Sequence, residues 1–144
     1  MSAAENELRE LYGRYIQAIN ERRFDDMDQF THDEINFNEQ MITRAEYCAV
    51  IQGNIDAVPD FFWWVDELVI DGNLLIARLV DHGTPAKPWL GLEPTGRQIN
   101  FIEYAIYRFQ DGRFNWINVV LDRPSIARQL SGVPEQVYAA QQLY

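Results

Sequence analysis

The chain has 144 residues, of which 47% are hydrophobic and 24% charged, and its formal net charge is −10. This length and composition are typical of a single globular domain. The acidic balance disfavours nucleic acid as a partner, and no stretch is apolar for long enough to span a membrane. The polar, acidic first ten residues do not resemble a signal peptide, and a lone cysteine excludes an internal disulfide framework. We therefore expect a cytoplasmic protein without nucleic-acid or membrane partners.

The first part of the chain has the periodicity of helices. Apolar residues recur at helical spacing between residues 8 and 19 and predict an amphipathic helix. A short second helix is expected over Phe24–Phe30 and a short strand over Glu34–Phe37. Thr43–Glu46 has the pattern of a capping box, so a third helix begins there and runs to about Ala57.

The second part of the chain has the pattern of long strands joined by turns. Two Asp-Gly pairs, at 71–72 and 111–112, each separate two apolar runs and predict β-hairpins. The expected strands are Phe61–Ile70, Asn73–Val80, Ile99–Phe109 and Phe114–Leu121. Helices followed by an antiparallel meander indicate an α+β fold.

A short helix is expected after the last strand. Asp122 stands where a helix N-cap would lie, with Pro124 inside the first turn. The helix should end near Gly132, and a second segment should follow Pro134.

The turn at Asp111-Gly112 sets the pairing expected in the last hairpin. If Phe109 faces Phe114, the further pairs are Tyr107–Trp116, Ala105–Asn118, Glu103–Val120 and Phe101–Asp122. All of these side chains should share one face of the sheet. Two carboxyl groups, Glu103 and Asp122, would then lie about 6–8 Å apart on an otherwise aromatic and apolar face. Burial and mutual repulsion would raise the pKa of at least one of them.

A carboxyl group with a raised pKa can transfer protons near neutral pH. Asp122 and Glu103 are therefore the candidate catalytic residues, with Asn118 as an alternative polar partner of Asp122. The expected walls are Phe101, Tyr107 and Trp116, which share the same face of the hairpin. The alternative is that both carboxylates lie in solvent or pair with arginines, and a register slip of one residue would move Glu103 to the opposite face.

The opposite face of the hairpin is also apolar, because it carries Ile102, Tyr104, Ile106, Ile117, Val119 and Leu121. A sheet that is apolar on both faces needs cover on both. Helices can cover one face, and the other is a candidate homodimer interface. The alternative is that the C-terminal tail folds back over it.

Several short motifs resemble those of the SnoaL-like polyketide cyclases, within the nuclear-transport-factor-2-like superfamily. They are Val58-Pro59-Asp60, the run Gly91–Arg97, Ile106–Phe109, Asp111-Gly112-Arg113, and Asp122 followed by Gln129-Leu130. The resemblance covers about residues 8–130 of a single domain 1–144, with residues 131–144 as a C-terminal tail. It implies a cone-shaped α+β barrel, in which N-terminal helices pack on a curved antiparallel or mixed sheet that encloses a pocket.

The resemblance also implies a reaction. Cyclases of this family use an aspartate near the end of the last long strand, the place of Asp122, as general acid/base for an intramolecular aldol condensation without metal or organic cofactor. Tyr15 on the first helix and Asn54 on the third match positions that orient the substrate. The family's glutamate-histidine-tryptophan run reads Trp116-Ile117-Asn118 here, so the polar part of the pocket differs.

Three further residues are candidates for the pocket. Asn38 follows the first short strand, and the alternative is that it belongs to an edge turn. Trp63 and Trp64 point to opposite sides of a strand, so at most one lines a pocket, and we assign Trp64. Trp89, in a proline-rich loop, is a candidate lid. The two histidines show no metal-ligand spacing, so no metal site is expected.

These patterns predict a cofactor-free cyclase or isomerase of secondary metabolism. It would act by general acid/base catalysis on a small apolar or aromatic carbonyl compound of polyketide or terpenoid type. Two alternatives stay open. One is an epoxide hydrolase in which two carboxylates activate water, and the other is a non-catalytic binding or dimerisation module.

Overall fold

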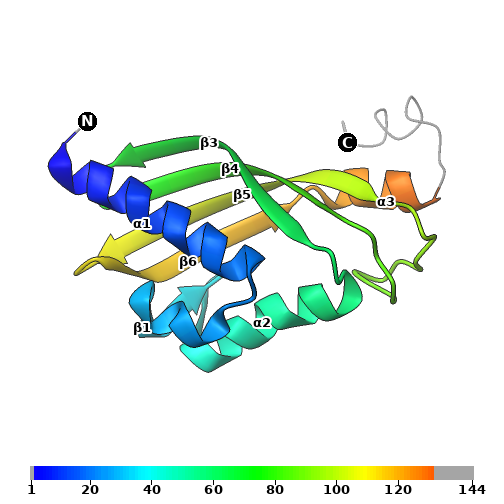
Figure 1. The fold of residues 1–144 in the computed structure, drawn as a ribbon, viewed down its shortest axis with the longest axis horizontal. Helices are drawn as coiled ribbons and strands as arrows, with labels where there is room; N and C mark the ends of the chain where they lie inside the picture. Colours follow the sequence, from blue (N-terminus) through cyan, green and yellow to red (C-terminus); the bar gives the residue numbers. More distant parts are fainter. Residues whose placement is uncertain (1, 132–144) are drawn as a thin grey trace.

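A computed structural model of the chain describes residues 2–131. Helices and a curved sheet form two layers (Figure 1). The elements in chain order are α1 (Ala3–Asn20), the 3-10 helix η1 (Phe24–Gln29), β1 (Thr31–Phe37), β2 (Gln40–Thr43), α2 (Arg44–Ala57), β3 (Phe62–Asp71), β4 (Leu74–Gly83), β5 (Ile99–Gln110), β6 (Arg113–Leu121) and α3 (Arg123–Ser131). The α+β class expected from the order of the elements is confirmed.

The strands form one mixed sheet in the order β2-β1-β6-β5-β4-β3. All neighbouring pairs are antiparallel except β1 and β6, which run parallel. The sheet does not close into a barrel, because β2 and β3 remain its edges. Helix α1 packs beside β3, and helix α2 packs beside β1. The two helices therefore cover the inner face of the open sheet.

Both long helices begin at capping boxes. Thr43 and Glu46 exchange side-chain and backbone hydrogen bonds at the start of α2, as expected from the sequence, and Ser2 and Glu5 do the same for α1. Apolar and tyrosine side chains at helical spacing bury one stripe of α1 against the sheet. These contacts direct Tyr15 of α1 and Tyr47 of α2 into the space between the layers.

The smaller elements differ from the sequence prediction. The segment after α1 is a 3-10 helix, β1 begins at Thr31 rather than at residue 34, and β2 was not predicted. The β1–β2 turn uses Asn38 and Glu39, which adopt the left-handed conformation (φ 48° and 71°) without a glycine to indicate it. The loop between β3 and β4 is Gly72–Asn73, because Asp71 pairs with Leu74. The predicted helix end near 132 and the segment after 134 lie outside the described residues.

The predicted register of the last hairpin is wrong beyond its first pair. Phe109 pairs with Phe114 as expected, but Arg108 then pairs with Trp116, so Asn115 is an extra residue on β6. This β-bulge reverses the face of every following residue. Glu103 consequently lies opposite Leu121 instead of Val120. Ile117, Val119 and Leu121 therefore replace Trp116, Asn118 and Val120 on the inner face.

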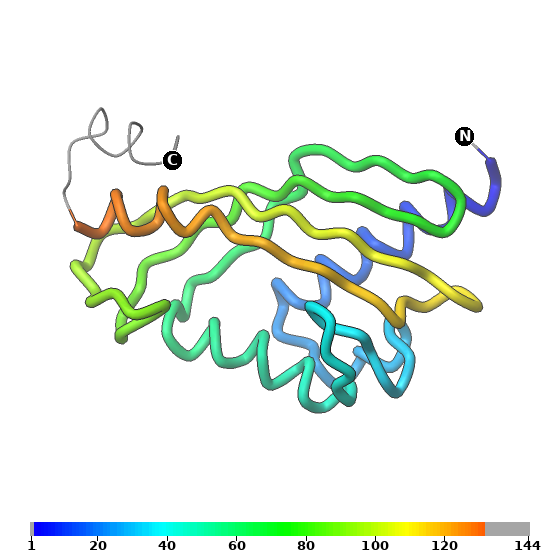
Figure 2. Tube along the Cα trace, turned by 180° about the vertical axis from the view of Figure 1, so that it is seen from behind, coloured from blue at the N-terminus to red at the C-terminus, as the bar shows by residue number. Residues whose placement is uncertain are grey.

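The outer face of the sheet carries exposed apolar side chains. Figure 2 shows β3 to β6 from this side, with α1 behind them and α2 below them. The outer patch consists of Trp64, Val69, Ile76 and Tyr104, with exposed fractions between 37% and 59%. Within residues 2–131, no helix is long and apolar enough to cross a membrane.

Candidate active site

A pocket of about 480 Å³ lies between the inner face of the sheet and the two long helices. Its size and largely apolar walls suit a small organic ligand. It is lined by Tyr15, Ile16 and Ile19 of α1, by Tyr47, Val50, Ile51 and Asn54 of α2, by Trp63, Leu79, Glu103, Tyr107, Ile117, Val119, Val120 and Leu121 of the strands, and by Phe37, Asn38, Phe61, Leu90 and Arg123. The exposed members of this set, Asn38, Val50, Val120 and Arg123, form what we call the rim.

Glu103 supplies the carboxyl group of the pocket. Alternation along β5 directs its side chain to the same face as Phe101 and Tyr107, and it is only 7% exposed. Among the described lining residues, Glu103 is the only acidic one and Arg123 the only basic one. The buried part of the pocket therefore contains one ionisable carboxyl group in an aromatic setting.

Asp81 lies behind Glu103 and is fully buried. It pairs with Trp63 of β3 and with Phe101 of β5, and it is diagonal to Glu103, whose partner on β4 is Leu79. Within residues 2–131, no N–H or hydroxyl group donates a hydrogen bond to either carboxylate oxygen of Asp81. A hydrogen bond between the two carboxyl groups therefore requires that one of them carries a proton.

The two carboxyl groups share that proton unequally. Burial, reinforced by the contact with Glu103, raises the pKa of Asp81 to about 11. Burial also raises the pKa of Glu103, while hydrogen bonds from Asp81 and from the Trp63 indole act in the opposite direction. Near neutral pH, Asp81 is thus protonated and donates to Glu103. Of the two carboxyl groups, Glu103 is the one that faces the pocket.

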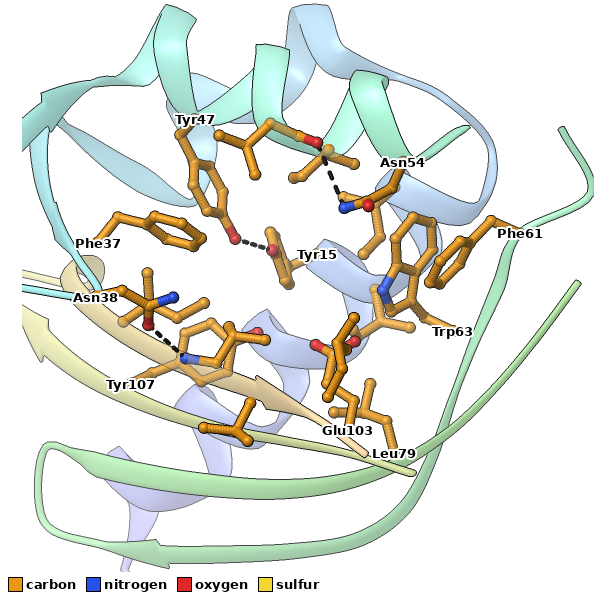
Figure 3. Close-up of a pocket in the computed structure, with 18 of the residues that line it drawn as sticks. Tyr15, Phe37, Asn38, Tyr47, Asn54, Phe61, Trp63, Leu79, Glu103 and Tyr107 are labelled. Carbon is orange, nitrogen blue, oxygen red and sulfur yellow. Dashed lines mark hydrogen bonds between the residues drawn. The ribbon is translucent and has the colours of Figure 1, made fainter. Parts of the chain in front are cut away.

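The Tyr15 and Tyr47 hydroxyls form the polar part of the wall opposite Glu103, and a second tyrosine pair, Tyr12 and Tyr107, lies next to Tyr15. The hydroxyl oxygens of Tyr15 and Tyr47 are 2.5 Å apart, and the Tyr12 hydroxyl donates to that of Tyr107 at 3.4 Å. Burial raises the pKa of all four well above the ordinary value, and the charge of Glu103 adds to the effect. All four therefore remain protonated. Figure 3 shows the Tyr15–Tyr47 pair and the Glu103 carboxyl group facing the same space from opposite sides.

The proline-rich loop between β4 and β5 supports one wall. The Trp89 indole donates a hydrogen bond of 2.9 Å to Asn54 Oδ1, and its ring packs against Phe61 and Phe101. Trp89 and Leu92 are joined by a tight turn in which Leu90 (φ 52°) and Gly91 (φ 76°) adopt the left-handed conformation. This turn places Leu90, rather than Trp89, in contact with the pocket.

Of the residues that the sequence named as candidates, the structure places Tyr15, Asn38, Asn54, Glu103 and Tyr107 around the pocket. The other predicted residues do not line it. Phe101 and Trp89 are buried behind its wall, and Trp89 is therefore not a lid.

Three corrections concern the faces of strands. The assignment of Trp64 is wrong, because Trp64 is 59% exposed on the outer face and Trp63 occupies the inner position. Trp116 and Asn118 also lie away from the pocket, because of the bulge in β6. Trp116 stacks under the Arg108 guanidinium at 4.9 Å, and Asn118 donates to Glu39.

Asp122 follows β6 directly but does not line the pocket. Its Oδ1 accepts the backbone N–H of Ser125 at 3.2 Å, so the side chain caps α3, as its place before Pro124 indicated. The expected pairing with Phe101 and the expected contact with Glu103 on one face are absent from the register of residues 2–131. The carboxyl partner of Glu103 is Asp81 instead.

Sequence reasoning missed Asp81, Tyr47, Trp63 and Arg123. A signal existed for Asp81, since it continues the alternation of Leu75, Ala77 and Leu79 along β4. A signal existed also for Tyr47, which lies four residues before Ile51 on the buried face of α2. Within residues 2–131, no group of three or more histidine, cysteine or acidic side chains converges as a metal site would.

Comparisons with known proteins agree with this geometry. The family model described as SnoaL-like polyketide cyclase matches residues 9–130. A SnoaL-like polyketide cyclase from Agrobacterium tumefaciens is 28% identical, with a TM-score of 0.82 over 85% of this chain and 97% of that one. IdmH from Streptomyces antibioticus, a candidate polyketide cyclase, is 20% identical (TM-score 0.77, 86% and 98% covered). AclR from Streptomyces galilaeus, a candidate hydroxylase, is 18% identical (0.75, 90% and 98%). None of the curated proteins compared with the chain matches it.

Proposed function

Because the chain belongs to the SnoaL-like polyketide cyclase family, we propose that it is a cyclase or isomerase that removes a proton next to a carbonyl group. The substrate is a polyketide- or terpenoid-like compound. Glu103 is the general base in this proposal, in place of Asp122. The observation that carries the proposal is the buried Asp81–Glu103 pair, which presents a single carboxylate to an aromatic pocket.

Glu103 is suited to accept a proton from carbon. Burial makes its carboxylate a stronger base than an exposed glutamate, while the hydrogen bonds from Asp81 and Trp63 favour its ionised form and fix its orientation. When Glu103 takes the proton, the substrate becomes an enolate. The same carboxyl group then returns the proton, so no other acid has to enter the buried site.

The Tyr15–Tyr47 pair is suited to stabilise the enolate oxygen. In such a pair one hydroxyl donates to the other, which leaves the hydrogen of the second hydroxyl available to a ligand. A donor that is already in place where negative charge develops stabilises the transition state without reorganisation. Glu103 and the tyrosine pair lie on opposite walls, so a flat carbonyl compound between them contacts both.

The fate of the enolate decides between the two reactions. Attack of its carbon on a second carbonyl of the same molecule forms the ring bond of an aldol product, with the proton passing to the new alkoxide. Return of the proton at a different carbon gives an isomer instead. Neither route needs an oxidant, a reductant or a cofactor in this proposal.

The sequence left an epoxide hydrolase and a binding module open. A hydrolase with two carboxylates acting on water is less favoured, because within residues 2–131 only one member of the carboxyl pair lines the pocket. Incorporation of oxygen from labelled water into product would support it. A binding module predicts retention of ligand without any exchange of its protons.

Exchange of acidic protons with solvent tests the proposal without knowledge of the natural product. 2-Tetralone is a bicyclic ketone with acidic protons beside its carbonyl group, and its deuterium uptake in D₂O is followed by NMR. Glu103→Gln should lower the catalysed exchange by at least about 100-fold. Glu67→Gln, a matched change at an exposed position of β3, should leave it unchanged. Absence of catalysed exchange by the wild type, or full exchange by Glu103→Gln, would reject Glu103 as the base.

We also propose that two copies of the chain associate through the outer patch. Trp64 and Tyr104 are 59% and 53% exposed on the outer face, and an apolar face of this kind is uncommon on a monomer. Analytical ultracentrifugation should give a dimer for the wild type and a monomer for Tyr104→Glu. A monomeric wild type would exclude the homodimer.

A further inference from the structure

We infer that the ligand of this pocket is an aromatic carboxylic acid whose carboxylate lies at the rim against Arg123. The carbonyl that reacts lies at the opposite end, beside Glu103, and that end of the orientation rests on the proposed function. The carboxylate contact at the rim stands on separate observations.

The charges of the pocket are separated. Glu103 is buried at its floor and Arg123 is exposed at its rim, and they are the only charged residues among the described lining residues. Within residues 2–131, Arg123 makes neither a hydrogen bond nor an ion pair. The adjacent Asp122 carboxylate is bound to the Ser125 N–H instead. In a chain with a net charge of −10, a cation that no residue between 2 and 131 pairs with, at a pocket entrance, is poorly explained by composition.

A second rim residue also presents donors. Asn38 Oδ1 accepts the backbone N–H of Val119 at 2.8 Å, and the left-handed backbone of Asn38 holds this arrangement in the β1–β2 turn. The acceptor of the amide is therefore occupied. Its NH₂ group points into the pocket (Figure 3) and has no partner within the described residues. The polar groups that the rim offers a ligand are thus N–H donors, which match the oxygens of an anion.

The floor of the pocket reinforces this orientation. A ligand carboxylate at the floor would lie beside the charge of Glu103 in a poorly hydrated site, where like charges repel strongly. At the rim the same carboxylate keeps part of its hydration and gains Arg123. Aromatic walls from Tyr15, Trp63 and Tyr107 between the two ends fit a flat hydrocarbon body.

Binding of matched probes tests this inference. 2-Naphthoate and methyl 2-naphthoate have the same ring system, and only the first carries a charge at pH 7.5. Titration by calorimetry should show that the wild type prefers the acid, and that Arg123→Gln weakens acid binding by about fivefold, the effect of a partly exposed ion pair. Binding of the ester should stay within about twofold. Arg9→Gln removes the same charge from an exposed turn of α1 and should change neither affinity.

The outcomes separate this inference from the proposed function. An acid preference that Arg123→Gln removes and Arg123→Lys largely restores supports it, whatever the proton exchange of Glu103→Gln. Equal affinity for acid and ester, no binding of either, or an equal loss in Arg9→Gln overturns it. Because Glu103→Gln removes a repulsive charge, that variant should bind 2-naphthoate at least as tightly as the wild type. Retained acid preference together with full exchange in Glu103→Gln would reject the catalytic proposal alone.

Discussion

Replacement of Asp81 by asparagine should stabilise the protein, and increasingly so as the pH rises. The asparagine would keep the shape of the side chain and a donor for Glu103, but it has no proton to lose. Asp81 itself titrates at 3.8 when exposed and at about 11 in the folded protein. Its contribution to stability is therefore fully present below pH 3.8 and is lost progressively as the pH rises towards 11.

The size of the effect follows from the shift in pKa. Between pH 3.8 and the folded pKa, the folded protein holds one proton more than the unfolded chain, so its free energy of unfolding falls by about 1.4 kcal/mol per pH unit. At pH 7, which is 3.2 pH units above 3.8, the accumulated loss of unfolding free energy has a ceiling of about 4.4 kcal/mol, and we expect Asp81→Asn to recover about 2–4 kcal/mol of it.

Urea unfolding followed by tryptophan fluorescence at pH 5, 7 and 8.5 measures this difference. The control is Asp71→Asn, an exposed aspartate at the end of β3, for which stability should not change with pH relative to the wild type. A gain that does not grow with pH, or a loss of stability at every pH, would refute a protonated Asp81.

Three further changes follow from the same site. The rate of proton exchange in 2-tetralone should rise with pH through a pKa above that of an ordinary glutamate, because burial raises the pKa of Glu103, and a profile that is flat between pH 4 and 8 would contradict this. Tyr47→Phe should lower the exchange rate by about 10- to 100-fold with little change in the affinity for 2-naphthoate, since the lost hydroxyl acts on the enolate. Leu90→Gly should keep the free energy of unfolding within about 1 kcal/mol of the wild type, because glycine relieves the left-handed backbone at φ 52° and this offsets the lost burial. The affinity for 2-naphthoate should fall, since Leu90 lines the pocket. Unchanged affinity would show that Leu90 does not contact the ligand.

Local patterns were sufficient for most of the fold. The capping box at Thr43–Glu46 indicated the start of α2, and the alternation of apolar residues indicated the long strands. These features depend on residues close in sequence, whose hydrogen bonds and periodicity are visible without the tertiary structure. The same holds for Asp122, whose role as a helix cap was also indicated by Pro124.

The bulge at Asn115 had no such signal. The turn at Asp111-Gly112 correctly paired Phe109 with Phe114, but an inserted residue without a glycine next to it cannot be seen in the pattern of β6. Because one residue reverses the faces of a strand, that single insertion moved Trp116, Asn118 and Asp122 out of the expected site.

The pairing of Asp81 with Glu103 depends on contacts that the sequence does not contain. The two residues are diagonal neighbours only because β4 and β5 pair across the intervening proline-rich loop, and that register was not fixed by a short turn. Glu103 was selected for its place on an aromatic face, which proved to be the inner face. Its partner could be found only once the neighbouring strand was in place.

The most direct test of Glu103 as the base compares Glu103→Gln with Asp122→Asn in the deuterium exchange of 2-tetralone. Both substitutions replace one carboxylate with an amide of the same shape, and asparagine still caps a helix, so α3 is retained in the second variant. The account predicts loss of catalysed exchange in Glu103→Gln and wild-type exchange in Asp122→Asn. Loss in Asp122→Asn with exchange preserved in Glu103→Gln would contradict it and return the catalytic role to Asp122.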